Sequence, residues 1–227
     1  MIYITGDCHG IHDIEKLRPH NFVDSDMNRE KDFLIICGDM GIVWSEEDDL
    51  WTKKLIDFYN KKNCKVLFID GNHENHKKLS TFPIKEWNGG KVHVISNNIL
   101  HLMRGQVFCI EGKTFFTMGG ANSTDKQYRI KDVTWWEEEI PNMPERSEAL
   151  RNLERVGNKV DFVITHTGPS SVLHQMGADY RIDEYTDWLE KINQTLEFKQ
   201  WYFGHFHVDK QVTSKHTELF NVIGMIV

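Results

Sequence analysis

The chain has 227 residues, which is enough for one α/β domain with a well-buried core. The net charge of −7 argues against an extended nucleic-acid surface, although bound divalent cations can reverse the sign locally. An apolar run of about 18 residues is absent, so we expect no membrane span. Met1 opens directly on an apolar run, and the four cysteines form no Cys-x-x-Cys pair. These features predict a reduced, cytoplasmic protein without a signal peptide.

The first part of the chain predicts parallel strands joined by a helix. Apolar runs at 1–6, 33–38 and 65–70 have the composition of buried strands. The stretch Ser45-Glu46-Glu47-Asp48 is typical of a helix N-terminus with Ser45 as its cap, and apolar residues at helical spacing continue to about Asn60. We expect this helix to cross over between two parallel strands.

The pattern changes at residue 92 to short strand-like segments separated by turn residues. The segments 92–96, 99–103, 107–111 and 114–119 predict an antiparallel meander that forms the second sheet of a sandwich. The stretch 120–147 follows without clear periodicity, and a loop of this length in a compact domain is usually functional. We interpret it as a long loop or cap segment.

The remainder of the chain alternates helices and strands again, within one domain that covers 1–227. The predicted helices are 145–156 and 184–197, and the predicted strands are 161–165, 200–204, 208–213 and 217–227.

Side chains that can bind metals follow five of the apolar runs, at the point where each run ends. The run 66–70 leads into Gly71-Asn72-His73-Glu74, which on its own could also cap a helix beginning near Asn75. The repetition at five strand ends favours a binding site, because open α/β sheets place ligands beyond the carboxyl ends of their strands. The candidate donors are Asp7, His9, Asp39, Asn72, His166, His205 and His207.

Three oxygen donors and four imidazoles suit borderline divalent metals such as manganese, iron or zinc, and they suit calcium poorly. Seven donors are too many for one ion and fit two ions that share a carboxylate. Asp7 and Asp39 supply two negative charges against four positive ones, and a bridging hydroxide and an incoming phosphate can balance the surplus. Two ions about 3.5–4 Å apart clamp both oxygens of an in-line phosphoryl displacement.

The ordered motifs resemble those of calcineurin-like metallophosphoesterases, from Met1 to about His207. The motifs are Asp7-x-His9, Gly38-Asp39, Gly71-Asn72-His73-Glu74, Thr165-His166 and Gly204-His205-x-His207. The resemblance implies a four-layer α-β-β-α sandwich of two mixed sheets flanked by helices, with a dimetal site at the C-terminal ends of the strands. It also implies metal-dependent hydrolysis of phosphate esters.

By the same resemblance, two divalent ions are the cofactors, with manganese favoured and iron, zinc, nickel or cobalt as alternatives. His73 would be a catalytic histidine that binds no metal and faces the leaving group. The implied ligand sets are Asp7, His9, Asp39 and His207 for one ion, and Asp39, Asn72, His166 and His205 for the other.

The second motif departs from the phosphoprotein-phosphatase branch, which continues it as Gly-Asp-x-x-Asp-Arg. Here Ile42 and Val43 stand at the last two positions, so the carboxylate that orients the catalytic histidine and the arginine that binds phosphate are both missing. Asp70 or Glu74 are the candidates to orient His73. Lys126 or Arg129 are the candidates to bind substrate, and both are equally well interpreted as surface cations.

The missing charged pair favours phosphodiester or nucleotide substrates. A phosphomonoesterase or protein phosphatase, and a non-catalytic scaffold on the same fold, stay open as alternatives. We interpret Trp44, Trp135 and Trp136 as packing residues. The expected partner is a small phosphate ester or nucleotide, with no membrane involved, and the sequence does not indicate the oligomeric state.

Overall fold

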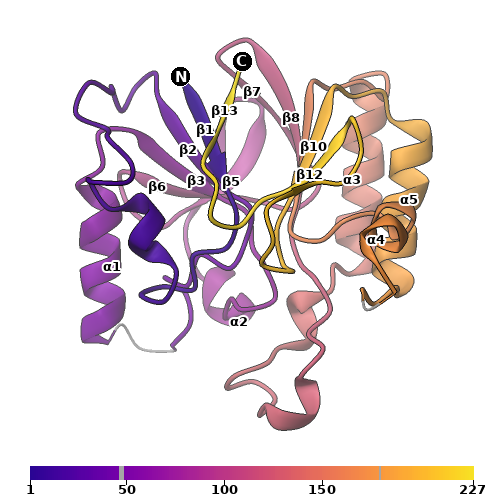
Figure 1. Ribbon diagram of the computed structural model, residues 1–227, viewed down its shortest axis with the longest axis horizontal. Helices are drawn as coiled ribbons and strands as arrows, with labels where there is room; N and C mark the ends of the chain where they lie inside the picture. The colour runs from indigo at the N-terminus through magenta and orange to yellow at the C-terminus, as the bar shows by residue number, and fades with distance from the viewer. Residues whose placement is uncertain (46–48, 179) are drawn as a thin grey trace.

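The computed structural model describes residues 1–45, 49–178 and 180–227. Two mixed β-sheets pack against each other (Figure 1). The strands of the first sheet are β1 (Ile2–Thr5), β2 (Phe33–Ile36), β3 (Lys65–Phe68), β4 (Ile84–Trp87), β5 (Gly90–Val94), β6 (Ile99–Leu102) and β13 (Gly224–Ile226). Those of the second sheet are β7 (Gln106–Ile110), β8 (Lys113–Met118), β9 (Phe162–Thr165), β10 (Gln200–Phe203), β11 (Lys210–Gln211) and β12 (His216–Glu218).

Each sheet has a parallel centre and antiparallel edges. The order is β13-β1-β2-β3-β6-β5-β4 in the first sheet and β11-β12-β10-β9-β8-β7 in the second. Strands β1, β2, β3 and β6 run parallel to one another, as do β8, β9, β10 and β12. The loops that follow the central strands therefore leave each sheet at a single edge.

Helices cover the outer face of each sheet. The α-helices are α1 (Leu50–Asn60), α2 (His76–Leu79), α3 (Met143–Arg155), α4 (Ser170–Met176) and α5 (Glu184–Thr195). Short 3₁₀ helices lie at η1 (Ile14–Leu17), η2 (Lys126–Tyr128) and η3 (Glu137–Glu139). Leu55 and Tyr59 of α1 pack on the first sheet, whereas α3, α4 and α5 pack on the second. The predicted four-layer sandwich is confirmed.

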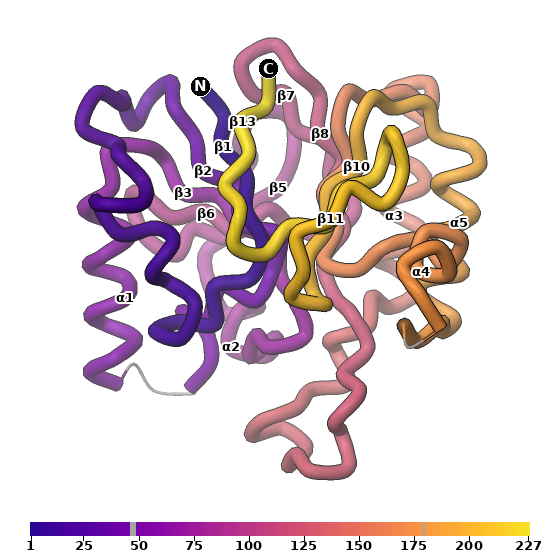
Figure 2. The backbone as a smooth tube through the Cα atoms, in the orientation of Figure 1, coloured from indigo at the N-terminus to yellow at the C-terminus, as the bar shows by residue number. Residues whose placement is uncertain are grey.

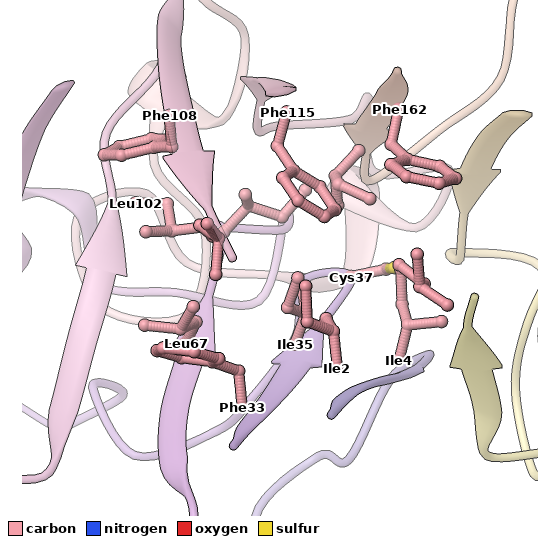
Figure 3. Close-up of a cluster of buried hydrophobic side chains, with 14 of the residues drawn as sticks. Ile2, Ile4, Phe33, Ile35, Cys37, Leu67, Leu102, Phe108, Phe115 and Phe162 are labelled. Carbon is pink, nitrogen blue, oxygen red and sulfur yellow. The ribbon is translucent and has the colours of Figure 1, made fainter. Parts of the chain in front are cut away.

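The core between the sheets consists of alternate strand residues (Figure 3). In β2, Phe33 and Ile35 point into this core, while Leu34 and Ile36 pack toward α1. All four are buried, since both faces of a central parallel strand are covered. This packing explains why the central strands were recognisable as continuous apolar runs. Among the described helices, none has the length and apolar character needed to cross a membrane.

The predicted antiparallel meander is correct in two of its pairings, β5 with β6 and β7 with β8, but wrong as one continuous meander of the second sheet. Strands β5 and β6 belong to the first sheet, where β6 runs parallel to β3, and β4 pairs with β5 at the edge without having been predicted. Only the hairpin of β7 and β8 belongs to the second sheet. The turn at Arg104-Gly105, with φ of +71° at Gly105, carries the chain from one sheet to the other. A crossing between sheets and a hairpin use the same turn residues, so the pattern alone could not separate them.

Three other elements, α1, α4 and β13, also differ from the prediction. Helix α1 begins at Leu50, and Asp49 caps it by accepting a hydrogen bond from the amide of Thr52 at 2.7 Å, so the assignment of Ser45 as the cap is wrong. The acidic residues 46–48 of that prediction lie outside the described residues. Helix α4 occupies a segment for which no helix was predicted, and β13 returns to pair with β1 in the first sheet.

The predicted long loop ends earlier than expected, because α3 begins at Met143 with a capping box formed by Asn142 and Glu145. Residues 120–142, which we call the arm, leave the body at the edge where the central strands end and then return to it (Figure 2). The arm contains η2 and η3, and its residue Trp136 is buried.

Candidate dinuclear metal centre

The predicted donors lie together at the edge where the central strands of both sheets end. The loops after β1, β2 and β3 supply four of them, and the loops after β9 and β10 supply the other three. Among the residues that the structure describes, three groups have ligand atoms within 4.8 Å of one another: Asp7, His9 and His207; His9, Asp39 and His73; and Asp7, Asp39 and His166.

The first predicted metal position lies between Asp7, His9, Asp39 and His207. Nε2 of His207 is 3.2 Å from Oδ2 of Asp7, and Nε2 of His9 is 3.2 Å from Oδ2 of Asp39. The other ring nitrogen of His9 lies 2.8 Å from the carboxylate of Asp13. A carboxylate behind a histidine fixes the ring and raises its basicity as a ligand, so Nε2 of His9 is presented to the centre.

The second predicted position is defined by three acceptor atoms that converge. Nδ1 of His166 lies 2.7 Å from the carbonyl oxygen of Cys37 and must donate to it, because a carbonyl can only accept. In the neutral ring Nε2 is then an acceptor, 3.0 Å from Oδ1 of Asn72 and 3.4 Å from Oδ2 of Asp39. With the ring neutral, three acceptors cannot satisfy one another, so this donor set needs either a proton on Nε2 or a bound metal ion.

The charges of the centre also indicate that it binds cations. Asp7 and Asp39 are buried carboxylates. Burial lowers the pKa of His166, but attraction to Asp39 and Asp7 outweighs this effect and raises the pKa to about 10 in the metal-free protein. Burial likewise lowers the pKa of His9, yet its hydrogen bond to Asp39 raises it to about 9. Burial lowers the pKa of His205 to about 3, so this ring is neutral and free to bind metal. The site therefore requires positive charge, from protons or from metal ions.

A hydrogen-bonded chain fixes the orientation of Asn72. The hydroxyl of Ser123 lies 2.6 Å from Oε2 of Glu139, whose other oxygen accepts from the amide of Ser123 at 3.0 Å. Because Ser123 donates its proton to the carboxylate, its oxygen accepts from Nδ2 of Asn72, at 3.0 Å. Oδ1 of Asn72 is then the end of the amide that faces His166.

Four of the donors have strained backbones. The φ angles are +40° at His9, +49° at Asp39, +82° at His205 and +57° at His207, in a region that non-glycine residues rarely occupy. Such strain persists where the surrounding structure imposes it, and it is concentrated at functional sites. The glycine before Asn72 is also required, since a Cβ on Gly71 would lie 2.1 Å from Oδ1 of Asp39.

His73 lies between an aromatic ring and a cation. Its imidazole stacks on Trp44 with ring centres 5.7 Å apart, and the two terminal nitrogens of Arg129 lie 3.1 Å from its two ring nitrogens. Burial lowers the pKa of His73, with Asp39 opposing this effect and Arg129 reinforcing it. The arm thus places Arg129, one of the two candidate substrate-binding cations, beside His73.

The other candidate cation, Lys126, makes its contacts elsewhere on the arm. Nζ of Lys126 lies 2.7 Å from Oε1 of the buried Glu139 and 4.9 Å from the centre of the Trp135 ring. This places Lys126 behind the Ser123 contact with Asn72, and gives it a part in holding the arm.

The carboxylates of Asp70 and Glu74 do not meet the expectation that one of them orients His73. Asp70 accepts from Arg104 at 2.8 Å and lies 3.0 Å from Nε2 of His101. Burial raises the pKa of Asp70, but Arg104 outweighs it and holds the pKa well below its usual range. Glu74 accepts from the amides of Gly71 and Gly41, at 2.5 and 3.3 Å, and burial raises its pKa to about 8. Both carboxylates hold the loop that carries Asn72 and His73.

Sequence reasoning missed Asp13, Ser123 and Glu139, which support donors of the centre, and Arg104, which holds Asp70. Asp13 carried a weak signal, since it lies four residues after His9 in a polar stretch. Ser123 and Glu139 lie in the aperiodic arm, where no pattern distinguishes them from neighbouring polar residues.

The comparisons with known proteins concern the same region. The family model described as calcineurin-like phosphoesterase matches residues 1–209, which include all the donors. A search of curated proteins finds no match. Members of this family hydrolyse phosphoric esters at a dinuclear centre of divalent metal ions, and the mixed α/β sandwich agrees with their fold. The chain therefore belongs to the calcineurin-like phosphoesterase family.

Proposed function

We propose that this protein is a phosphodiesterase that acts on small esters, including nucleotides. The observation that supports this preference is the placement of Ile42 and Val43, which occupy the positions of the charged pair in the phosphoprotein-phosphatase branch. Both side chains are buried, in the apolar cluster beneath α1. Neither of them offers a charge to a dianionic monoester.

The proposed ligands of the two ions are those of the sequence analysis: Asp7, His9, Asp39 and His207 for one, and Asp39, Asn72, His166 and His205 for the other. Two divalent ions, when bound, neutralise charge on the phosphate and lower the pKa of bound water. We propose manganese as the native metal. Asp39 is the proposed shared ligand, because its Oδ2 lies 3.2 Å from Nε2 of His9 and 3.4 Å from Nε2 of His166.

The protein's own side chains supply the remaining chemistry. His73 is the proposed proton donor to the departing oxygen, because it lies at the centre yet is not needed to complete the two ligand sets. Arg129 is fixed by Asp125, at 2.7 Å, with its guanidinium against His73. A guanidinium in that place can contact an ester oxygen. One guanidinium suits the single charge of a diester better than the double charge of a monoester.

Two other functions are alternatives to the proposed phosphodiesterase. A phosphomonoesterase or protein phosphatase would use the same ions with a different substrate preference. A non-catalytic scaffold has no use for four strained donor positions or for an arginine directed at His73, so these features support an enzyme.

The experiment compares kcat/KM for bis(p-nitrophenyl) phosphate and p-nitrophenyl phosphate with the manganese-loaded protein. We expect the diester to be hydrolysed at least as efficiently as the monoester, and a chelator to abolish both reactions. A large preference for the monoester, or rapid phosphate release from phosphopeptides, would support the phosphatase. Metal binding without turnover of either ester would support the scaffold.

Two further expectations belong to this proposal. We propose that residues 1–227 act as one domain, since both sheets contribute donors to the centre and the arm contacts it. We also propose a reducing, cytoplasmic location, because the four cysteines are free thiols and three of them are buried.

A further inference from the structure

A cavity of about 610 Å³ opens beside the metal centre. His9, His73 and His207 form part of its wall, so a substrate bound at the centre can extend into it. The remaining wall is largely apolar and includes Ile11, Trp44, Trp51 and Leu55. Small-molecule sites have volumes of about 300–1,000 Å³ and this kind of lining.

The apolar surface of this cavity is exposed to an unusual degree. Trp51 is 55% exposed and Ile11 is 48% exposed, and α1 and the loop after β1 present them to the same space. Adjoining exposed apolar side chains in a concave surface are typical of binding sites. The aromatic surface continues to the centre, because Trp44 stacks on His73 at an interplanar angle of 25°.

Apart from the histidines, the charged groups among the described lining residues are the carboxylates of Asp13 and Asp49. Asp13 accepts from His9, and Asp49 caps α1, but each carboxylate keeps further acceptor positions. Acceptors beside aromatic rings suit a flat ring that bears N–H donors. The negative charge opposes a second phosphate in the cavity.

We propose that this cavity binds the nucleobase of a nucleoside phosphodiester, with Trp51 and Trp44 as its stacking surfaces. The inference rests on the proposed phosphodiesterase activity and names the substrate class of that site. Stacking of a base on an aromatic side chain accounts for about 10- to 100-fold in binding.

The test uses two diesters that differ only in the base. One is the methyl ester of adenosine 5′-phosphate, and the other is the methyl ester of 1-O-methylribose 5-phosphate. Because the scissile bonds and leaving groups match, a difference in kcat/KM reports the base alone. We expect the adenosine ester to be at least about 10-fold better with the manganese-loaded protein.

Three variants test whether the preference for the adenosine ester comes from Trp51. Trp51→Ala should bring the ratio of the two kcat/KM values close to one with little change for the ribose ester, and Trp51→Phe should keep most of the ratio. Leu150→Ala removes an apolar side chain of similar exposure, 51%, from α3 and should leave the ratio unchanged. Calorimetry with free adenosine gives a readout independent of turnover, and we expect binding that Trp51→Ala weakens.

The outcomes separate this inference from the proposed function. Equal kcat/KM values for the two esters, or a ratio that Trp51→Ala leaves intact, would overturn the base site while leaving the phosphodiesterase in place. Adenosine binding without turnover of any diester would support the base site and contradict the phosphodiesterase.

Discussion

The side-chain amide of Asn72 donates to the hydroxyl oxygen of Ser123 at 3.0 Å, across 51 residues of sequence. An amide can turn either its oxygen or its nitrogen toward a metal ion, and only the oxygen can bind one. Ser123 can accept from Asn72 because its own proton is donated to Glu139, at 2.6 Å. The arm therefore determines which end of Asn72 faces the centre.

Replacement of Ser123 should weaken metal binding. In Ser123→Ala the amide of Asn72 loses its partner and can turn its nitrogen inward, so we expect metal affinity to fall by about 10- to 100-fold. Calorimetric titration of the metal-free protein with manganese measures this directly. Ser171→Ala is the matched control, because Ser171 donates to Glu190 at the same 2.6 Å on the exposed surface. Equal manganese affinity in Ser123→Ala and the wild type would contradict the orienting role.

The two carboxylates of the centre should differ in how many ions they hold. Asp39 lies between the two predicted positions, so Asp39→Ala should lose both ions, whereas Asp7→Ala should retain about one ion per chain. Activity should disappear with a strong chelator and return with manganese. Elemental analysis of the purified variants gives the metal content, and normal occupancy in Asp39→Ala would show that this carboxylate is not shared.

Removal of Arg129 should impair turnover without affecting metal content. Its guanidinium lies against His73 and makes no contact with the predicted ligands among the described hydrogen bonds. Loss of an ionic contact to phosphate costs a few kcal/mol at most, so kcat/KM should fall by about 10- to 100-fold in Arg129→Ala.

Metal content and thermal unfolding serve as checks on this variant. Lys131→Ala is the control, because Lys131 lies on the same arm and pairs with the exposed Glu137. An unaltered kcat/KM in Arg129→Ala would mean that Arg129 does not contact the substrate and is only a surface cation.

The sequence allowed the candidate metal donors to be predicted where an apolar strand ends in a glycine and a polar side chain. Buried strands such as β2 are apolar throughout, and a side chain like Asp39 stands out against that background. The position of each donor on the chain, and the gathering of the donors at one edge, followed from this contrast alone.

The sequence was less informative where a contact joins distant polar residues. Asp70 was expected near His73 because the two are close in the chain, yet its carboxylate turns to Arg104, which lies beyond β6. A buried carboxylate is most stable beside a buried cation, and the pairing depends on the strand order, which was predicted wrongly at β6. The Ser123 contact with Asn72 could not be predicted because the arm has no periodic pattern that would place Ser123.

The contribution of Asp161 to the stability of the metal-free protein should be lost in acid. Asp161 joins β8 to β9 by accepting from the amide of Thr114 at 2.8 Å, and it pairs with Lys199 at 2.8 Å. The pairing with Lys199, with the hydrogen bonds from Thr114, lowers the pKa of Asp161 from 3.8 to about 2. The unfolded chain therefore binds more protons in this window, and the stabilisation is present above pH 3.8 and lost as the pH falls toward 2.

Asp161→Asn tests this dependence. The carboxylate is partly exposed, so after solvent screening we expect the variant to be about 1 kcal/mol less stable than the wild type at pH 7. Urea unfolding in the presence of a chelator should show a constant difference from pH 7 to about 5 and a smaller one below about 4. The exposed Asp26→Asn should show no such difference. A gap that stays constant down to pH 3 would indicate that the loss of Asp161 acts through packing and not through its charge.

His73 should matter most for substrates with poor leaving groups. It shares a cluster with His9 and Asp39, yet the two predicted ligand sets are complete without it. A proton delivered to the departing oxygen contributes about 10²–10⁴-fold, and an alkoxide needs that proton far more than nitrophenolate does. His73→Gln should therefore retain both ions, lose methyl-ester turnover severely and lose nitrophenyl-ester turnover much less.

The measurement is the ratio of variant to wild-type kcat/KM across diesters whose leaving groups increase in basicity, with metal content determined for each preparation. A uniform loss across the series would mean that His73 positions the phosphate, because positioning affects all leaving groups alike. Loss of an ion in His73→Gln would instead make His73 a ligand, as its cluster with His9 and Asp39 allows.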